Sequence, residues 1–336
     1  MIIQTLRVAG ALMLGFCFLA SPAFADLQEV DDAYLPAVVF PRYATGSGPT
    51  ICVDSGHSNF NSLDKRYKPL ALLLRADGYR TVSISEKFDK TALAKCRILV
   101  IANALPAITG AQPGDVDWDA YPYPSPSAFS DKEANSLHRW VEGGGSLLLI
   151  TDHMPFPEAA AKIASVFGFE LNNGFAVENF TTEAEGRAAF DIPTLFRTDD
   201  GTLLQHPITH GESDSDRVTK IRTFIGSAFR APSGAEPLLR LPENFVSLMP
   251  EKAWRFTLDT KRISVGGWLQ GAVMQVGKGR LAVFGEAGMF TAQIQKSSGQ
   301  AVPMGMNAPH AEQNYRFILN LMRWLSPDPQ VKSEVK

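Results

Sequence analysis

Between residues 50 and 170 the chain alternates between two hydrophobic patterns. Short apolar runs, typical of buried strands, lie at 50–53, 79–85, 96–102 and 146–151. Segments whose apolar residues recur every three to four positions, typical of amphipathic helices, lie at 68–76, 89–95, 130–140 and 157–167. The third helix is predicted to begin with a capping box formed by Ser130 and Glu133. This alternation predicts a parallel sheet with helices on both faces.

The remainder of the chain has a different pattern. Residues 171–270 are rich in turn residues and poor in helical periodicity, which predicts short strands and loops inserted into or packed beside the sheet. The runs 271–276 and 280–285 flank Gly277-Lys278-Gly279, which predicts a hairpin. Residues 311–325 form a closing amphipathic helix. We therefore expect one main domain at 48–326, with the insertion at 171–270 and a tail at 327–336.

The N-terminus has the features of a secretory signal. Arg7 precedes an apolar run at 8–20, which is shorter than the roughly 20 residues of a membrane span. The run ends in a small-x-small pattern at 21–25, which predicts cleavage before Asp26 and leaves 26–47 as an N-terminal extension. Phe16 stands where a lipoprotein would need a small residue before Cys17. We expect a periplasmic or secreted protein with no transmembrane anchor after cleavage.

Charge narrows the class of partner. The formal net charge is −3 and no Lys/Arg run occurs, which argues against a nucleic-acid partner. A small-molecule or glycan ligand is the expected partner. The sequence does not indicate the oligomeric state.

Two cysteines, Cys52 and Cys96, remain after signal removal. A pair in an exported protein favours a disulfide. However, both fall in predicted strands, Cys52 near the end of one and Cys96 at the start of another. In parallel neighbours the sulfurs would be separated by several residues along the strands, beyond disulfide reach. We therefore predict two free, buried thiols.

Polar residues follow four predicted strands. In open parallel sheets, ligands bind beyond the carboxyl ends of the strands. These positions hold Asp54, His57 and Asn59 after the first strand, Asn103 after the third, Asp152 and His153 after the fourth, and Glu286 after the strand near 284. We expect Asp54, His57, Asp152, His153 and Glu286 to converge on one solvent-accessible crevice as catalytic residues. Asn59, Asn103, His310 and Asn314 are candidates for substrate binding.

Two kinds of chemistry suit this set. Asp54, His57, Asp152 and His153 offer oxygen and nitrogen ligands for a divalent metal such as zinc. Alternatively, a carboxylate and a histidine could perform acid–base catalysis on water. Each residue also has a structural interpretation, since aspartates cap helices and histidines bond to loop backbone. Residues 52–56 resemble protease aspartate loops, but the second aspartate, the serine motif and a G-x-S-x-G elbow are missing.

Taken together, these segments resemble the class I glutamine-amidotransferase-like superfamily, in its uncharacterised and trehalose-utilisation-type branches. The matching segments are 53–60 (VDSGHSNF), 144–153 (GGSLLLITDH), 277–280 (GKGR) and 314–325 (NYRFILNLMRWL). The resemblance spans most of 48–326 but is thin across 175–265. We accordingly predict an α/β fold with a flavodoxin-like, doubly wound, mostly parallel sheet and a strand- and loop-rich insertion.

The chain departs from that superfamily at its nucleophile. In amidotransferases the strand matching 147–151 leads into a catalytic cysteine, whereas here it leads into Asp152-His153. Because thiolate chemistry needs a thiol, cysteine-dependent glutamine hydrolysis should be absent. Two functions remain: a hydrolase of an envelope or glycan-type small substrate, with or without a metal, and a non-catalytic ligand-binding or scaffold domain.

Overall fold

The computed structural model describes residues 18–19, 28–36, 38–107, 116–191, 193–297 and 300–326. The predicted signal peptide lies outside these residues except for Phe18 and Leu19, and the tail at 327–336 lies outside them entirely. Both remain predictions. Within the described part of the chain, no helix has the length and apolarity needed to cross a membrane.

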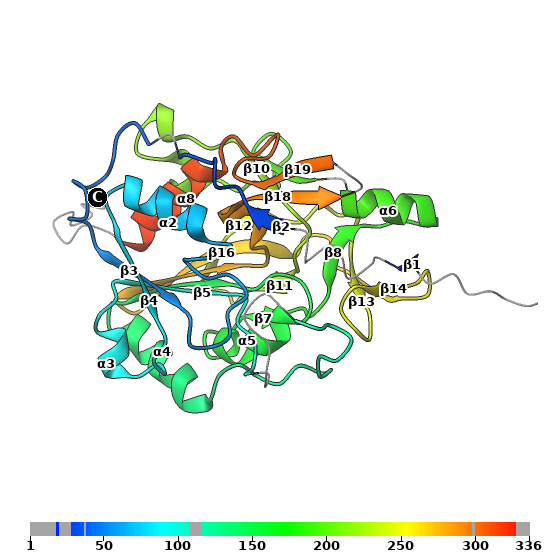
Figure 1. Cartoon of the computed structure of the whole chain (residues 1–336), viewed down its shortest axis with the longest axis horizontal. Helices are drawn as coiled ribbons and strands as arrows, with labels where there is room; N and C mark the ends of the chain where they lie inside the picture. The colour runs from blue at the N-terminus through cyan, green and yellow to red at the C-terminus, as the bar shows by residue number, and fades with distance from the viewer. Residues whose placement is uncertain are drawn as a thin grey trace, which may run out of the picture.

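A mixed, largely parallel sheet forms the centre of the molecule (Figure 1). Its parallel part runs in the order β4 (Arg80–Ile84), β3 (Thr50–Asp54), β5 (Ile98–Ala102), β6 (Ser146–Ile150) and β17 (Gly279–Phe284). An antiparallel part continues from β17 through β16 (Leu269–Val276), β11 (Phe229–Arg230) and β7 (Glu170–Leu171), and β12 (Ala235–Arg240) also pairs with β16. The turn predicted at 277–279 joins β16 and β17, so the hairpin prediction is confirmed.

Helices cover both faces of the sheet (Figure 1). On one face lie α2 (Lys68–Ala76) and α8 (Asn314–Leu325), and on the other α3 (Lys90–Leu93), α4 (Asp131–Glu142) and α5 (Phe156–Ser165). Alternate strand residues supply the two cores, because successive side chains point to opposite faces. Ile51 and Val53 pack in the core beside α2, whereas Cys52 packs in the core beside α4.

The capping box predicted for α4 is present. The Glu133 amide donates to Ser130 Oγ at 3.3 Å, and the Ser130 amide donates to Glu133 Oε2 at 3.1 Å. Glu133 is nevertheless buried, which a capping glutamate on a helix surface would not be. Its other carboxylate oxygen is therefore available to a second partner inside the protein.

The stretch 171–270 contains short strands and loops, and also a helix of 9 residues at Glu183–Asp191 that its composition did not predict. β8 (Phe175–Glu178), β13 (Phe245–Met249) and β15 (Lys261–Ser264) form one small sheet, and β9 (Thr194–Arg197) and β10 (Lys220–Thr223) form another. The other elements here are α6 (Glu183–Asp191), α7 (Pro207–His210), η1 (Asp214–Asp216) and β14 (Arg255–Phe256), which pairs with β1 (Phe18–Leu19). Outside this stretch, β2 (Gln28–Val30), β18 (Ala292–Ser297) and β19 (Gln300–Gly305) form a third sheet, preceded by η2 (Gly288–Phe290).

The prediction of two free thiols is wrong, because Cys52 and Cys96 form a disulfide with their Cα atoms 5.5 Å apart. The error lies in the placement of Cys96. β5 begins at Ile98, and Cys96 lies in the turn after α3, where its amide donates to Leu93 O at 3.1 Å. Because Cys96 is not in the strand, the separation along the strands does not apply. It approaches Cys52 from the face that α3 covers.

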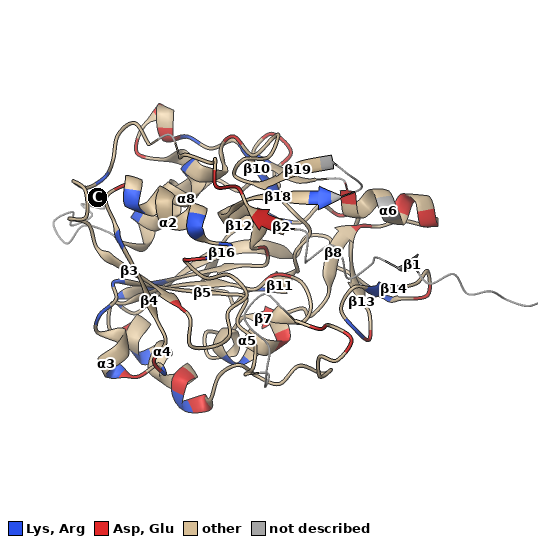
Figure 2. Cartoon of the chain, viewed as in Figure 1, with Lys and Arg blue, Asp and Glu red and all other residues tan. Residues whose placement is uncertain are grey.

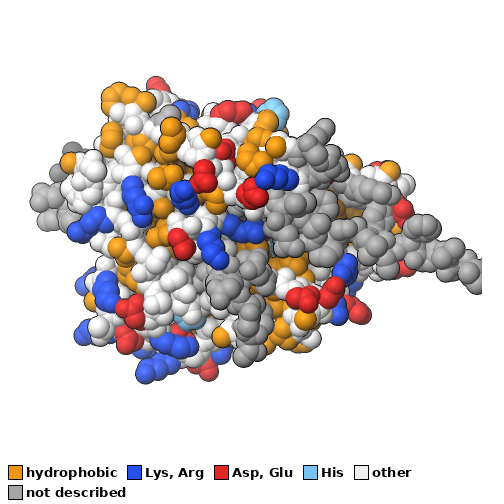
Figure 3. All heavy atoms as spheres, in the orientation of Figure 1, with side chains coloured by type: hydrophobic (Ala, Val, Ile, Leu, Met, Phe, Trp, Pro, Cys, Tyr) orange, Lys and Arg blue, Asp and Glu red, His pale blue; other side chains and the backbone are white. Residues whose placement is uncertain are grey.

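Charged side chains are mixed over the molecule. Figure 3 shows Lys/Arg and Asp/Glu side chains interspersed on the face viewed, without one large area of a single sign. This distribution accompanies the small net charge of −3.

Candidate functional site at the carboxyl edge of the sheet

Asp54 and His57 belong to a buried ion-pair network. His57 Nδ1 lies 2.9 Å from Asp54 Oδ2, and Nε2 lies 2.9 Å from Glu133 Oε1. A histidine that donates from both nitrogens is an imidazolium cation. Its side chain is only 3% exposed, and its ring packs against those of Phe88 and Phe129, with centroids 4.6 and 4.5 Å away.

The electrostatics of this network favour the charged histidine. Burial alone would lower the pKa of His57, but the bonds to Asp54 and Glu133 outweigh it and raise that pKa. Burial likewise opposes ionisation of Glu133, yet its bonds from Ser130 and His57 lower its pKa to about 2. Both nitrogens of His57 are occupied and solvent does not reach the ring. The geometry thus favours a structural role for His57.

Two asparagines hold the strand-end loops together. Asn59 Nδ2 donates to Asp54 Oδ2 at 2.6 Å, and its Oδ1 accepts from the Ala102 amide at 3.0 Å. Asn103 Oδ1 accepts from the Asp152 amide at 2.9 Å. Both asparagines are buried. These bonds are internal to the protein, and the substrate-binding role predicted for both side chains stays a prediction.

Asp152 and His153 form a second, more accessible group, with side chains 15% and 12% exposed. His153 Nδ1 lies 2.8 Å from Met154 O, so this nitrogen carries the proton that the carbonyl accepts. When the ring is neutral, Nε2 therefore has a free lone pair. It lies 4.0 Å from Asp152 Oδ1, which is too long for a direct hydrogen bond but suits a bridging water or ligand group.

Aromatic rings fix the His153 side chain. Phe175 stacks on it at 4.5 Å with 12° between the planes, and Trp254 contacts it edge-on at 4.5 Å. Phe156 lies 5.7 Å away. Such packing holds the ring in one orientation, which a residue that acts on a bound molecule needs.

Glu286 lies buried near Asp152. Its Oε2 accepts from the Met289 amide at 2.8 Å, and its Oε1 accepts from the Gly288 amide at 2.5 Å. Burial and then the charge of Asp152 raise its pKa to about 8, against the opposing effect of these backbone bonds. Tyr67 lies in the same environment, since Glu286 and Asp152 add to the burial that raises its pKa.

We expect Glu286 to make stability fall as pH rises. A carboxyl group that keeps its proton up to about pH 8 in the folded state, but loses it near pH 4.3 when unfolded, destabilises the fold progressively through that window. In Glu286→Gln the melting temperature should therefore decline less between pH 5 and 8 than in the wild type. The two proteins are compared by the slope of melting temperature against pH. Glutamine leaves one backbone N–H without its acceptor, which lowers the melting temperature at every pH without changing the slope. Parallel slopes in the two proteins would contradict the prediction.

The last two candidates, Asn314 and His310, have other hydrogen-bond partners. Asn314 is buried and bonds the backbone of Arg222 on both sides, accepting from its amide at 3.1 Å and donating to its carbonyl at 2.8 Å. His310 is exposed, and its amide donates to Glu312 Oε1 at 2.9 Å. Among the described residues, neither side chain forms a hydrogen bond with Asp152, His153 or Glu286. Their predicted substrate-binding role stays a prediction.

The convergence of the five residues on one crevice stays a prediction, and three of them, Asp54, His57 and Glu286, are buried. Asp54 and His57 bond to each other on the α4 face of the sheet, where their neighbours Phe88 and Phe129 also pack. Glu286 and Asp152 interact beside Tyr67, which packs in the core on the α2 face. Asp54 lies two residues after Cys52 and so faces the same side of the sheet.

The four predicted metal ligands are not gathered. In the part of the chain that is described, no group of three or more His, Cys, Asp or Glu side chains is placed to hold a metal ion. His57 has both nitrogens engaged by carboxylates. Asp152 and His153 offer two donors at most, fewer than the three protein ligands of a catalytic zinc.

Positive φ at non-glycine residues occurs beside both groups and was not visible in the sequence. Among the described non-glycine residues, positive φ occurs at Ser58, Asn103, Ile225, Trp254 and His310. Trp254 contacts His153, and Asn103 bonds the Asp152 amide. Ile225, with φ of 73°, precedes Gly226, where an added Cβ would lie 2.9 Å from Glu286 Cβ. A β-branched residue rarely adopts this conformation, and such outliers cluster at functional sites.

Comparisons with known proteins support the fold. No protein-family model matches the chain, and no curated protein does. A solved structure described as the mmIFT52 N-terminal domain is 13% identical, with a TM-score of 0.53, over 83% of this chain and 98% of that one. At this identity the likeness shows the fold alone.

Two further solved structures carry names related to the resemblance of the sequence. A putative ThuA-like protein from Bacteroides uniformis is 10% identical over 86% of this chain and 94% of that one, with a TM-score of 0.42. A putative GMP synthase protein from Thermoplasma acidophilum is 11% identical over 82% and 92%, with a TM-score of 0.39. With TM-scores below 0.5, these two structures carry no argument about this chain.

Proposed function

We propose that this chain is an exported hydrolase of a small polar or glycan-type substrate, with Asp152 and His153 as its reactive pair. The observation that carries the proposal is the 4.0 Å gap between His153 Nε2 and Asp152 Oδ1, at partly exposed side chains fixed by aromatic packing. A gap of this size between two acceptors accommodates a water or a substrate hydroxyl.

The chemistry follows from the tautomer. With Nδ1–H donated to Met154 O, the neutral imidazole takes a proton from a bridging water through Nε2. The hydroxide equivalent attacks the substrate, and the imidazolium returns the proton to the leaving group. Asp152 stabilises the imidazolium while it exists. Glu286 is buried and does not reach the substrate; holding its own proton below about pH 8, it avoids adding a second negative charge beside Asp152.

We derive no step through a metal, because the predicted ligands do not form a set that fits one. The architecture we infer is flavodoxin-like and doubly wound, which the order of the five parallel strands supports. Export is supported by the signal-like N-terminus and by the disulfide, since disulfides persist in oxidising compartments.

The test uses chromogenic nitrophenyl glycosides and esters with wild-type protein, Asp152→Asn and His153→Ala. We expect each substitution to lower turnover by about 10²- to 10⁴-fold, with the melting temperature of Asp152→Asn nearly unchanged. As a matched control, Asp131→Asn removes an exposed carboxylate at the start of α4 and should leave turnover intact.

The alternative is a non-catalytic ligand-binding domain. It is favoured if the wild type hydrolyses none of these compounds but binds a member of a glycan panel, and Asp152→Asn abolishes that binding. Turnover that persists in both Asp152→Asn and His153→Ala would overturn the proposed site.

A further inference from the structure

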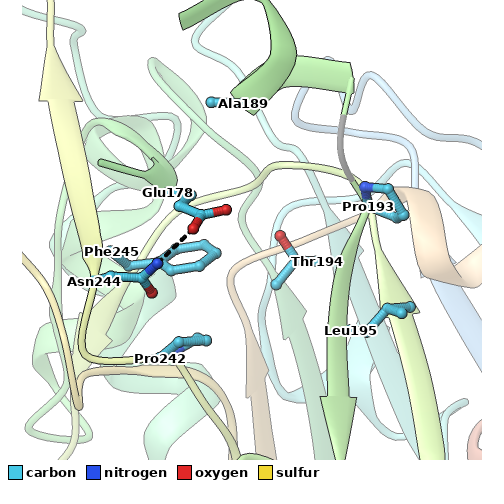
Figure 4. A pocket seen from close by; sticks show the side chains of 8 residues that line it. All are labelled: Glu178, Ala189, Pro193, Thr194, Leu195, Pro242, Asn244 and Phe245. Atoms are coloured by element: carbon cyan, nitrogen blue, oxygen red, sulfur yellow. Dashed lines mark hydrogen bonds between the residues drawn. The ribbon is translucent and has the colours of Figure 1, made fainter. Parts of the chain in front are cut away.

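A surface hollow of about 240 Å³ lies outside the strand-end groups, between the end of β8, α6 and the start of β9 (Figure 4). Glu178, Asn244 and Phe245 form one wall, and Thr194 and Leu195 stand opposite them. The volume is below the range of roughly 300–1,000 Å³ of pockets that hold a whole drug-sized ligand. It suits one long side chain.

The wall formed by Glu178, Asn244 and Phe245 carries a carboxylate with spare acceptor capacity, that of Glu178. Asn244 Nδ2 donates to Glu178 Oε1 at 2.6 Å and so orients the carboxylate. In the described part of the chain, no group donates to Oε2. A carboxylate held in this way is a ready partner for an ammonium or guanidinium group.

The opposite wall offers unpaired backbone. Thr198 N donates to Thr219 O, so these two residues form a hydrogen-bonded pair of the antiparallel ladder between β9 and β10. Hydrogen-bonded and non-hydrogen-bonded pairs alternate along an antiparallel ladder. Arg197 and Leu195, one and three residues before Thr198, therefore belong to non-hydrogen-bonded pairs. Their N–H and C=O groups point away from β10. The Arg197 carbonyl agrees with this assignment, because it accepts from Leu203 N, on the side of β9 that faces away from β10. Leu195 has no such partner among the described residues.

We propose that this hollow binds an extended peptide segment carrying a lysine or arginine. The segment adds to the outer edge of β9 by pairing with the Leu195 backbone, and its basic side chain enters the hollow to reach Glu178. Strand addition of this kind takes affinity from main-chain bonds and specificity from a side-chain pocket. Charge supports the cationic partner, because α6 brings Glu183, Glu185 and Asp191 to this end of the molecule (Figure 2).

This proposal is independent of the hydrolase proposal, because no residue of the hollow belongs to the Asp152 group. The probe is a short labelled peptide of alternating threonine and valine with one central lysine, and its match has glutamate in place of the lysine. Fluorescence anisotropy with the mature full chain should show saturable binding of the lysine peptide only, weaker at high salt.

Three substitutions test the contacts. Glu178→Gln keeps the bond from Asn244 and should weaken binding about tenfold. Glu170→Gln removes the same charge at β7, on another sheet edge, and should have no effect. Leu195→Pro removes only an outward N–H and is tolerable at an edge strand; it should weaken binding more than Leu195→Ala, which keeps the N–H.

The possible results separate the peptide from other ligands. If lysine amide alone binds as tightly as the peptide, the hollow is an amine site and strand addition is wrong. If the lysine peptide does not bind at millimolar concentration, or if Glu178→Gln and Glu170→Gln behave alike, the proposal is overturned. Hydrolase activity in Glu178→Gln should equal that of the wild type.

Discussion

Replacement of His57 by alanine is expected to lower the free energy of unfolding by about 3–5 kcal/mol, because it leaves the carboxylates of Asp54 and Glu133 buried without their shared cation. Chemical denaturation at pH 6 measures the change. His138→Ala is the matched control: His138 is half-buried on α4 and packs against Phe167 at 5.2 Å, without an ion pair, so the loss should be smaller.

The loss of unfolding free energy in His57→Ala should depend on pH in a defined direction. Since the pKa of His57 is raised in the folded state, its stabilisation is complete below the ordinary value near 6.5 and is lost as pH rises through the folded pKa. The difference between wild type and His57→Ala should therefore shrink at alkaline pH. A double-mutant cycle with Glu133→Gln should show coupling. An unfolding free energy within about 1 kcal/mol of the wild type, combined with lost turnover, would return His57 to the active site.

Local patterns were sufficient for most of the parallel half of the fold. Hydrophobic spacing predicts the buried strands at 50–53 and 146–151 and the helix at 68–76. The tertiary packing buries the same apolar residues, so it agrees with the local pattern. The capping box at Ser130 is equally local. The strand β7 at the far edge has two residues, and runs this short have no detectable period.

The candidate site could not be predicted from the residues at each strand end alone, because some of their partners are far away in the sequence. His57 could be placed at the carboxyl edge, but its partner Glu133 is 76 positions away, and the sequence presents that residue as an ordinary capping glutamate. Parity offered a usable signal: Asp54 is two residues after Cys52 and so faces the same side. Trp254 and Ile225 could not have been found, because positive φ at such residues is imposed by surrounding structure.

Cys96 shows how a small boundary error reverses a chemical conclusion. The apolar pattern places the start of the strand at residue 96, whereas β5 begins at Ile98. Placed in the turn instead, Cys96 reaches Cys52. Element boundaries are the least certain part of a sequence-based assignment, and disulfide reach depends on them directly.

Loss of the Cys52–Cys96 bond is expected to lower the free energy of unfolding by about 4 kcal/mol. The bond closes a loop with a sequence separation of 44, and cross-linking a loop of that length removes a corresponding entropy from the unfolded chain. For a domain of this size the melting temperature should fall by about 6 °C. Thermal unfolding of the mature chain from Asp26, with and without reductant, measures the shift, and the double variant Cys52→Ser with Cys96→Ser should match the reduced protein.

Thiol counting checks the chemistry directly. A protein prepared from Asp26 onward does not contain Cys17, so in its denatured form it should react with no thiol reagent until a reductant is added. Reductant should leave the melting temperature of the double variant unchanged, which separates the effect of the bond from effects of the reagent. Two reactive thiols in the denatured, unreduced protein would refute the disulfide, and with it the position of Cys96 beside Cys52 in the core that α3 and α4 cover.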